Sequence, residues 1–287
     1  MDTSSNQFSG IITKKDRIIV IGDLHADFEK TREIFLKLKL IDYNNKWTAN
    51  PLDTFVVQVG DQVDGQRGNN YTSGEMRIID FLDEIHSQAK CYNGGVYSLI
   101  GNHELMNFLG DYRYTSDNDM INKEQSFCLG TPFALKISKN RMIILKIGKY
   151  LFIHAGIMPH HLTKDSCIDG NKFINDINDL IRKLLNNEIK SNHPLVQKYF
   201  TNPNSLLWTR ELGAEQINCN KIEQVTECLN IGSIIVGHTV QEKGINSKCN
   251  NKVWRVDVGL SSIFNNNNSS VLEIREDNPD PFKIIKI

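Results

Sequence analysis

The sequence predicts an α/β fold in which two β-sheets pack together and helices lie on the outside. Three patterns support this fold class. Short apolar runs alternate with amphipathic stretches up to residue 101, strand-like runs follow one another between residues 131 and 156, and further strand-like runs come after residue 230. Alternation of strands with helices is typical of βαβ units and a largely parallel sheet, whereas consecutive strands with short breaks favour hairpin or meander pairing.

The expected strands are short apolar runs bounded by glycine or polar turn residues. In chain order they cover residues 17–22, 53–60, 95–101, 131–137, 141–148, 149–156, 231–237, 252–259, 270–276 and 282–287. The asparagine-rich segment 265–270 separates two of them and is expected to be a solvated hairpin tip.

The expected helices carry apolar residues three or four positions apart, which places them on one face. These helices cover residues 28–40, 74–89 and 171–189. The apolar face of the second helix is expected to reach the core through Met76, Ile79, Phe81, Leu82 and Ile85.

The composition is that of an ordinary globular protein. Of the 287 residues, 40% are hydrophobic and 23% are charged, and the net charge is −1. No global basic surplus therefore suggests a nucleic-acid or membrane-surface partner. No internal repeat or long linker divides the chain, so a single domain is expected over residues 1–287, with its core from about residue 17 and a helical insertion over about 157–205.

The cysteines and the N-terminal segment bear on location. Residues 1–10 are polar and lack the basic and apolar regions of a signal peptide, and the longest apolar runs are too short to cross a bilayer. The six cysteines form no C-x-x-C pair, so they are expected to be free thiols in a reducing compartment. Together these features predict a cytoplasmic protein with no membrane partner.

Five strand-like runs end in a small residue followed by Asp, Asn or His. They are "VIGDLHAD" (20–27), "VVQVGDQVDG" (56–65), "SLIGNHEL" (98–105), "LFIHAG" (151–156) and "IIVGHT" (234–239). Ligands of open α/β sheets gather outside the carboxyl ends of the strands, so these five ends are expected to converge on one site. Their polar residues are Asp23, His25, Asp61, Asp64, Asn102, His103, His154 and His238. Carboxylates with neutral imidazoles suit manganese, iron or zinc.

Taken together, the motifs resemble the pattern of the calcineurin-like metallophosphoesterases, which is GDxH, GDxxDRG, GNHE, a histidine-glycine element and GHT or GHS. Within that superfamily, GNHE, "LLWTREL" (206–212) and "VGHT…VWRVDVGLS" resemble the phosphoprotein-phosphatase group, especially its Shewanella-like and bacterial-type branch. The resemblance extends from about residue 17 to residue 262. It implies a four-layer sandwich of two mixed β-sheets flanked by helices.

The resemblance also implies that residues of these motifs hold two divalent metal ions, which would be manganese, iron or zinc. The implied metal ligands are Asp23 and His25 for the first ion, Asp61 for both ions, and Asn102, His154 and His238 for the second. His103 would be the general acid, paired with Asp64. The implied reaction is hydrolysis of a phosphomonoester by a hydroxide held between the two ions. The substrate would be a phosphorylated protein or a small phosphoester.

One position departs from the family pattern. GDxxDRG places an arginine directly after its second aspartate, whereas this chain has Gly65 there, then Gln66 and Arg67. A bidentate guanidinium matches the oxygens of phosphate, so the candidate phosphate-binding residues are Arg67, displaced by two positions, and Arg210, with Asn102 as a further one.

Three functions follow from these motifs. The leading one is a serine/threonine protein phosphatase. The altered "DGQRG" loop leaves open a hydrolase of dinucleoside polyphosphates or of RNA caps, as in the related ApaH-like branch, although the near-neutral net charge argues against long RNA. The missing arginine also leaves open a non-catalytic scaffold that binds phosphoproteins, although every expected metal ligand is present.

Overall fold

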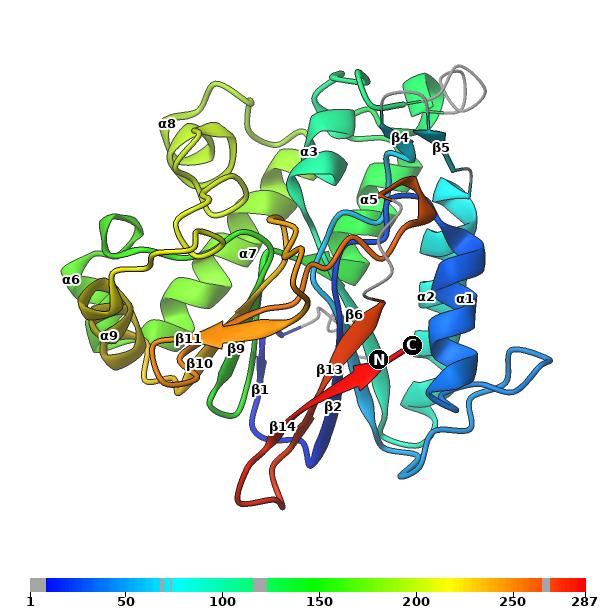
Figure 1. Ribbon diagram of the computed structural model, residues 1–287. Helices are drawn as coiled ribbons and strands as arrows, with labels where there is room; N and C mark the ends of the chain where they lie inside the picture. Colours follow the sequence, from blue (N-terminus) through cyan, green and yellow to red (C-terminus); the bar gives the residue numbers. More distant parts are fainter. Residues whose placement is uncertain (1–8, 68–69, 73, 116–122, 265–268) are drawn as a thin grey trace, which may run out of the picture.

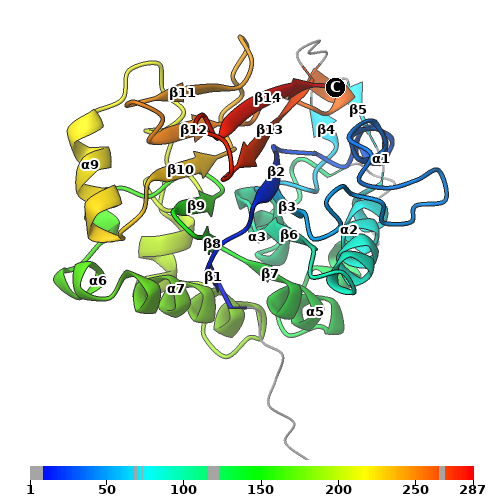
Figure 2. The same ribbon diagram turned by 90° about the horizontal axis from the view of Figure 1, so that it is seen from below.

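Two six-stranded sheets face each other at the centre of the molecule, and helices cover their outer faces (Figures 1 and 2). The computed structural model describes residues 9–67, 70–72, 74–115, 123–264 and 269–287. Each sheet contains both parallel and antiparallel pairs. The predicted four-layer sandwich of two mixed sheets flanked by helices is therefore confirmed.

The first sheet has the strand order β14-β13-β2-β3-β6-β7. Its parallel strands are β2 (Arg17–Ile21), β3 (Phe55–Gln58), β6 (Gly95–Leu99) and β7 (Arg141–Met142). Its antiparallel strands are β13 (Ser270–Arg275) and β14 (Phe282–Lys286). The helices on its outer side are α1 (Phe28–Lys37), α2 (Glu75–Lys90) and α5 (Pro132–Asn140) (Figure 2).

The second sheet has the strand order β1-β8-β9-β10-β12-β11. Its central parallel strands are β9 (Tyr150–Ile153), β10 (Ser233–Val236) and β12 (Val253–Arg255). The outer strands are β1 (Ile11–Ile12), β8 (Ile144–Ile147) and β11 (Asn246–Lys248). The helices on the outer side are α6 (Lys164–Ile168), α7 (Gly170–Leu185) and α9 (Cys219–Cys228) (Figure 2).

The core divides in two because successive side chains of a strand point to opposite faces. In β9, Tyr150 and Phe152 pack in the core between the two sheets. Leu151 and Ile153 instead pack in the core beneath α7 and α9. A strand buried on both faces reads as a continuous apolar run, which explains why this strand was recognised from sequence without alternation.

Residues 131–137 were predicted to be a strand, and this prediction is wrong. They lie at the start of α5, where the Thr131 hydroxyl accepts a hydrogen bond from the Ala134 N–H at 3.2 Å. Pro132 occupies the first helical turn, where its missing N–H costs nothing. A threonine cap followed by proline is a helix-start signal that outweighs the short apolar run that suggested a strand.

The asparagine-rich segment was predicted to be a hairpin tip, and its residues 265–268 lie outside the described residues. The strands on either side, β12 and β13, belong to different sheets, so these two strands do not form a hairpin with each other. The chain instead passes from one sheet to the other through the short 3-10 helix Ser262–Phe264.

Four of the six cysteines form disulfides, so the prediction of free thiols is wrong for them. Cys167 bonds to Cys228, and Cys219 bonds to Cys249, whereas Cys91 and Cys128 are exposed free thiols. Helix α9 is thereby tied down at both ends. The partners are 61 and 30 residues apart in the sequence, so their proximity is a product of the fold. The inference of a reducing compartment rested on free thiols and loses that basis.

Among the residues that the structure describes, no helix has the length and apolar character needed to cross a membrane.

Candidate active site

The five polar strand ends come together where the two sheets meet. β2, β3 and β6 are adjacent parallel strands and lead to Asp23, Asp61 and Asn102. β9 and β10 are adjacent parallel strands of the other sheet and lead to His154 and His238. A hydrogen bond from the Gly237 N–H to the His154 carbonyl, 2.8 Å long, holds the last two ends together.

Asp61 lies at the centre of this site. Its Oδ2 is 3.3 Å from Nε2 of His154 and 3.9 Å from Nε2 of His103, and its Oδ1 accepts a 2.9 Å hydrogen bond from the His103 N–H. Two buried groups share Asp61, one with His25 and His103 and one with His154 and His238, and the ligand atoms within each group lie within 4.8 Å of one another. One carboxylate therefore belongs to two potential metal-binding groups.

The other predicted metal ligands border these groups. Oδ1 of Asn102 is 2.9 Å from Nε2 of His154. The Asp23 carboxylate lies outside both groups and accepts the His238 N–H at 3.1 and 3.2 Å. Asp23 thus contacts the backbone of a residue predicted for the second ion, while the ring of His25 packs 5.0 Å from that of His103.

The site concentrates buried negative charge. Burial raises the pKa of Asp23 well above its usual range, and the charges of Asp257 and Asp61 raise it further. Burial also raises the pKa of Asp257, to about 6, with a contribution from the Asp61 charge. Carboxyl groups behave this way when too little positive charge lies near them, and bound cations would supply it. The residues present therefore fit a metal site.

The pKa values of the two imidazoles in the second group are shifted in opposite directions. Burial lowers the pKa of His238 to about 3, assisted by the positive charges of His154 and Arg210, so this ring is neutral as a metal ligand must be. Burial also lowers the pKa of His154, but the Asp61 carboxylate outweighs it and leaves the pKa raised.

The backbone around the site is strained. His25, Asp61, Asp64 and His238 adopt φ values of 42°, 55°, 68° and 67°, in the left-handed region that side chains other than glycine rarely adopt. Such residues cost about 1–3 kcal/mol each and persist where the surrounding structure holds them in place. Clustering of this strain at polar strand ends is typical of functional sites.

Glu104 holds one of these strained turns in place. Its carboxylate accepts backbone hydrogen bonds from Gly101 at 2.7 Å, Asp61 at 2.9 Å, Gln62 at 2.6 Å and Val63 at 3.2 Å. The Glu104 side chain therefore joins the GNHE segment to the turn that carries Asp61. Glu104 lies in the first turn of α3 (Asn102–Phe108), and it was not among the residues predicted for the site.

His103 and Asp64 form a hydrogen-bonded pair. Nδ1 of His103 is 2.6 Å from Oδ2 of Asp64, and both side chains are buried. Burial raises the pKa of Asp64, but the hydrogen bond and charge of His103, together with Lys123, outweigh it and hold this pKa well below its usual range. The carboxylate is therefore ionised and accepts a hydrogen bond from Nδ1. This leaves Nε2 directed toward Asp61.

The structure explains why no arginine follows Asp64. A Cβ at Gly65 would lie 2.2 Å from the carbonyl oxygen of Thr72, because the hairpin of β4 (Gln66–Arg67) and β5 (Asn70–Tyr71) folds back over this position. The Thr72 N–H donates to the Gly65 carbonyl at 2.8 Å. Backbone atoms therefore fill the space that a side chain at position 65 would need.

The two candidate phosphate-binding arginines lie on different elements. Arg67 pairs with Asn70 in the hairpin, and its side chain is outside the described part of the structure. Nη1 of Arg210 donates to the His238 carbonyl and to the Thr239 hydroxyl, both at 3.2 Å. Arg210 therefore borders the second group of potential metal ligands.

Sequence reasoning missed several buried residues of the site. Besides Glu104, they are Glu75, Lys123 and Asp257. Asp257 lies in the "VDVG" segment after β12, where an apolar run again precedes a polar residue, so the strand-end pattern could have found it. Lys123 and Glu75 follow no strand, and no local signal marks them.

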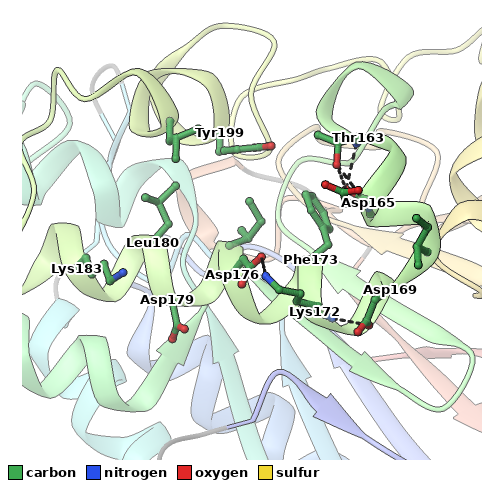
Figure 3. Close-up of a pocket in the computed structure, with 14 residues that line it drawn as sticks. Thr163, Asp165, Asp169, Lys172, Phe173, Asp176, Asp179, Leu180, Lys183 and Tyr199 are labelled. Carbon is green, nitrogen blue, oxygen red and sulfur yellow. Dashed lines mark hydrogen bonds and ion pairs between the residues drawn. The ribbon is translucent and has the colours of Figure 1, made fainter.

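A separate groove of about 650 Å³ lies in the outer helical layer (Figure 3). Its walls come from α6, α7 and the π-helix Gln197–Thr201, with apolar Phe173 and Leu180 among charged side chains. On α7, Nζ of Lys172 is 2.7 Å from Oδ2 of Asp176. The described lining residues include none of the predicted site residues, so this groove is distinct from the strand-end site.

Comparison with known proteins agrees with this geometry. Residues 16–242 match the calcineurin-like phosphoesterase family. The chain is 28% identical to Shewanella-like protein phosphatase 2 of Arabidopsis thaliana, over 92% of this chain and 76% of the relative. It is also 28% identical to Shewanella-like protein phosphatase 1 of Plasmodium berghei, over 87% of this chain and 68% of the relative. The fold matches that of a cold-active protein-tyrosine phosphatase of a psychrophilic Shewanella species, with a TM-score of 0.76, 22% identity and coverage of 94% and 78%.

Proposed function

Because the chain belongs to the calcineurin-like phosphoesterase family, we propose that this metal-dependent phosphoesterase is a protein phosphatase that hydrolyses phosphoserine and phosphothreonine with two divalent cations. The observation that carries this proposal is the position of Asp61, whose single carboxylate belongs to two groups of potential ligands. The similarity to proteins named as protein phosphatases supports a phosphoprotein substrate.

The residues proposed to hold the cations are those of the strand ends. They are Asp23, His25 and Asp61 for the first ion, and Asp61, Asn102, His154 and His238 for the second. The donors suit manganese, iron or zinc. When bound, two such ions activate a water molecule for attack and neutralise charge on the phosphate oxygens.

The chain itself supplies the proton for the leaving group. His103 donates it from Nε2, while the Asp64 carboxylate accepts a hydrogen bond from the Nδ1–H and fixes the orientation of the ring. His103 is thus assigned to proton transfer, although its Nε2 also lies near Asp61.

Phosphate binding is assigned to residues around the same centre. Arg210 and the Asn102 amide bind the phosphate oxygens, and Arg67 is assigned to the same role from its position in the sequence. Arg210 now hydrogen-bonds a backbone carbonyl and a hydroxyl, neither of which is charged, so a phosphate dianion would compete well for its guanidinium.

The test is turnover of phosphoserine, phosphothreonine and phosphotyrosine peptides by manganese-reconstituted protein. We expect metal-dependent hydrolysis that His103→Ala lowers by about 100-fold or more, since general acid catalysis contributes about 10²–10⁴-fold. His193→Ala, which removes a half-buried histidine outside the site, is the matched control and should leave turnover unchanged. Absence of metal-dependent turnover on every ester would refute the proposal.

A second candidate function rests on Gly65. Because the hairpin closes the position after Asp64, the site lacks an arginine there, and a larger phosphoanhydride substrate could be held differently. Diadenosine tetraphosphate and capped RNA therefore belong in the same substrate panel. Faster hydrolysis of either than of the phosphopeptides would favour this function, whereas bound metal without any hydrolysis would indicate a phosphoprotein-binding scaffold.

A further inference from the structure

We propose that Lys123 is a positioning residue for the reaction: its ammonium group holds the Asp64 carboxylate in the orientation that directs His103 toward the leaving group. This inference rests on the proposed function, in which His103 donates the proton. Lys123 comes 59 residues after Asp64 in the chain, and it belongs to none of the recognised motifs.

Lys123 is almost completely buried, and its ammonium group lies among acceptors. Its side chain is 2% exposed, and its Nζ forms ion pairs with Oδ1 of Asp64 and, at 2.6 Å, with Oε2 of Glu75. Nζ also donates to the Thr115 hydroxyl at 2.9 Å, and it lies 5.7 Å from the centre of the Phe127 ring. A buried lysine needs such partners, because burial of an unpaired charge is costly.

Glu75 closes a ring around Asp64. Its Oε1 accepts the Asp64 N–H at 2.9 Å, while its Oε2 contacts Lys123, which in turn contacts the Asp64 carboxylate. The backbone and the side chain of Asp64 are thus fixed by the same pair of residues. This matters because Asp64 has a strained φ of 68° and its orientation needs external support.

The two oxygens of Asp64 have separate tasks. Oδ1 accepts hydrogen bonds from the Lys123 ammonium group, from the Asn107 amide at 3.0 Å and from the Thr115 hydroxyl at 3.3 Å. Oδ2 is 2.6 Å from Nδ1 of His103. With Oδ1 held by three donors, the carboxylate cannot rotate without losing several hydrogen bonds, so Oδ2 stays directed at the imidazole.

The burial of Lys123 decides its role. A side chain that is 2% exposed cannot reach a phosphate, so Lys123 acts on the reaction through Asp64 and not on the substrate. It also supplies the positive charge beside Asp64 at a place where Gly65 supplies none. The two carboxylates, Asp64 and Glu75, would otherwise be buried next to each other, and repulsion between them would favour a neutral or displaced Asp64.

The experiment compares two aryl phosphates on manganese-reconstituted wild type and Lys123→Met. Phenyl phosphate has a poor leaving group that needs a proton, whereas 2,4-dinitrophenyl phosphate has a good one that does not. We expect kcat for phenyl phosphate to fall by about 10–100-fold, kcat for the dinitrophenyl ester to fall by less than about 3-fold, and KM for both to stay within about 2-fold, since only proton donation is impaired.

Three further variants separate positioning from folding. Lys123→Met/Glu75→Gln removes both opposite charges, keeps the local net charge and should show the same selectivity between the two esters. Lys123→Met in an Asp64→Asn background should lower kcat no further, because Lys123 acts through Asp64. Arg17→Met breaks another buried ion pair, between Arg17 and Glu273, and should lower stability without selectivity between the esters.

The outcomes are distinct. A selective loss of kcat on phenyl phosphate in Lys123→Met or in Lys123→Met/Glu75→Gln supports the inference. Equal losses on both esters, including losses caused by unfolding of both variants, or no loss at all, overturn it while leaving the proposed function intact. Failure of the proposed function has another signature, which is wild-type protein that hydrolyses neither ester with added manganese.

Discussion

The strand-end site and the outer helical layer of α6, α7 and α9 hold their charges in opposite ways. In the site, carboxylates are buried close to one another, and burial and mutual repulsion raise the pKa values of Asp23 and Asp257. In the helical layer, charges are exposed and paired locally, as Lys172 is with Asp176. The site therefore carries charge repulsion that bound cations would relieve, whereas the charges of the helical layer are already paired or solvated.

The two regions also differ in how they are fixed. Disulfides tie down both ends of α9, and exposed ion pairs add little to stability. The strand-end turns are instead held by hydrogen bonds to buried carboxylates, of which Glu104 is the main one. Substitutions in the site should therefore affect activity far more than stability. Changes in the helical layer should affect stability far more than activity.

The largest expected effect is on activity. Asp61→Asn removes the carboxylate shared by both ligand groups, so turnover should fall by about a thousandfold or more as metal binding and charge neutralisation are lost. Steady-state assays with saturating manganese would measure this. Asp176→Asn, in the groove of Figure 3, is the matched control and should be as active as wild type. Near-normal activity of Asp61→Asn would show that activity does not depend on the shared carboxylate.

The next effect is on stability. Reduction of the two disulfides should lower the free energy of unfolding by about 2–4 kcal/mol for each bond, because the unfolded chain regains the freedom that the links removed. Thermal unfolding with and without reductant would measure it, and turnover per folded molecule at 25 °C should be unchanged. The double variant Cys91→Ser/Cys128→Ser, which alters only the free thiols, should melt like wild type.

A smaller effect should appear in the pH dependence of metal-free protein. The pKa of Asp257 is about 6 in the folded state against 3.8 in the unfolded chain, so the folded state binds more protons between these values. Stability should therefore fall as pH rises from about 4 to 6, by about 3 kcal/mol from this residue alone. Denaturant unfolding of chelator-treated wild type and Asp257→Asn would show it, since the variant should lack this fall. An identical pH profile for the two would contradict the proposed repulsion.

The smallest expected effect concerns the exposed pair in the groove. Lys172→Met breaks its ion pair with Asp176 in solvent, where such pairs contribute little. The melting temperature of Lys172→Met should match that of wild type. The melting temperature of Arg17→Met, which breaks a buried ion pair, serves as the reference. A clear drop for Lys172→Met would mean that the helical layer depends on its pair with Asp176 more than the exposure of this pair indicates.

Most of the fold and the strand-end residues could be predicted because their signals are local. An apolar run, a glycine and a polar residue lie side by side in the sequence, as before Asp23 and His238, and the sheet then brings the ends together. The segment 131–137 shows the limit of this reasoning, since its short apolar run suggested a strand, whereas the capping threonine and the proline begin a helix.

What the sequence could not indicate depends on contacts between distant residues. Lys123 reaches Asp64 across 59 residues, and the two disulfides join cysteines 61 and 30 residues apart. Gly65 was visible as a departure from the family pattern, but its cause, the carbonyl of Thr72, required coordinates. Such contacts leave no periodic or adjacent pattern to recognise.

The number of metal ions bound per chain tests directly whether Asp61 is shared by two cation sites. Metal-stripped protein would be titrated with manganese and the bound ion measured after dialysis. We expect two ions for wild type, one for His25→Ala or His154→Ala, which each remove a ligand from one group, and fewer than one for Asp61→Asn. One ion or none in wild type, or two ions in Asp61→Asn, would contradict this expectation.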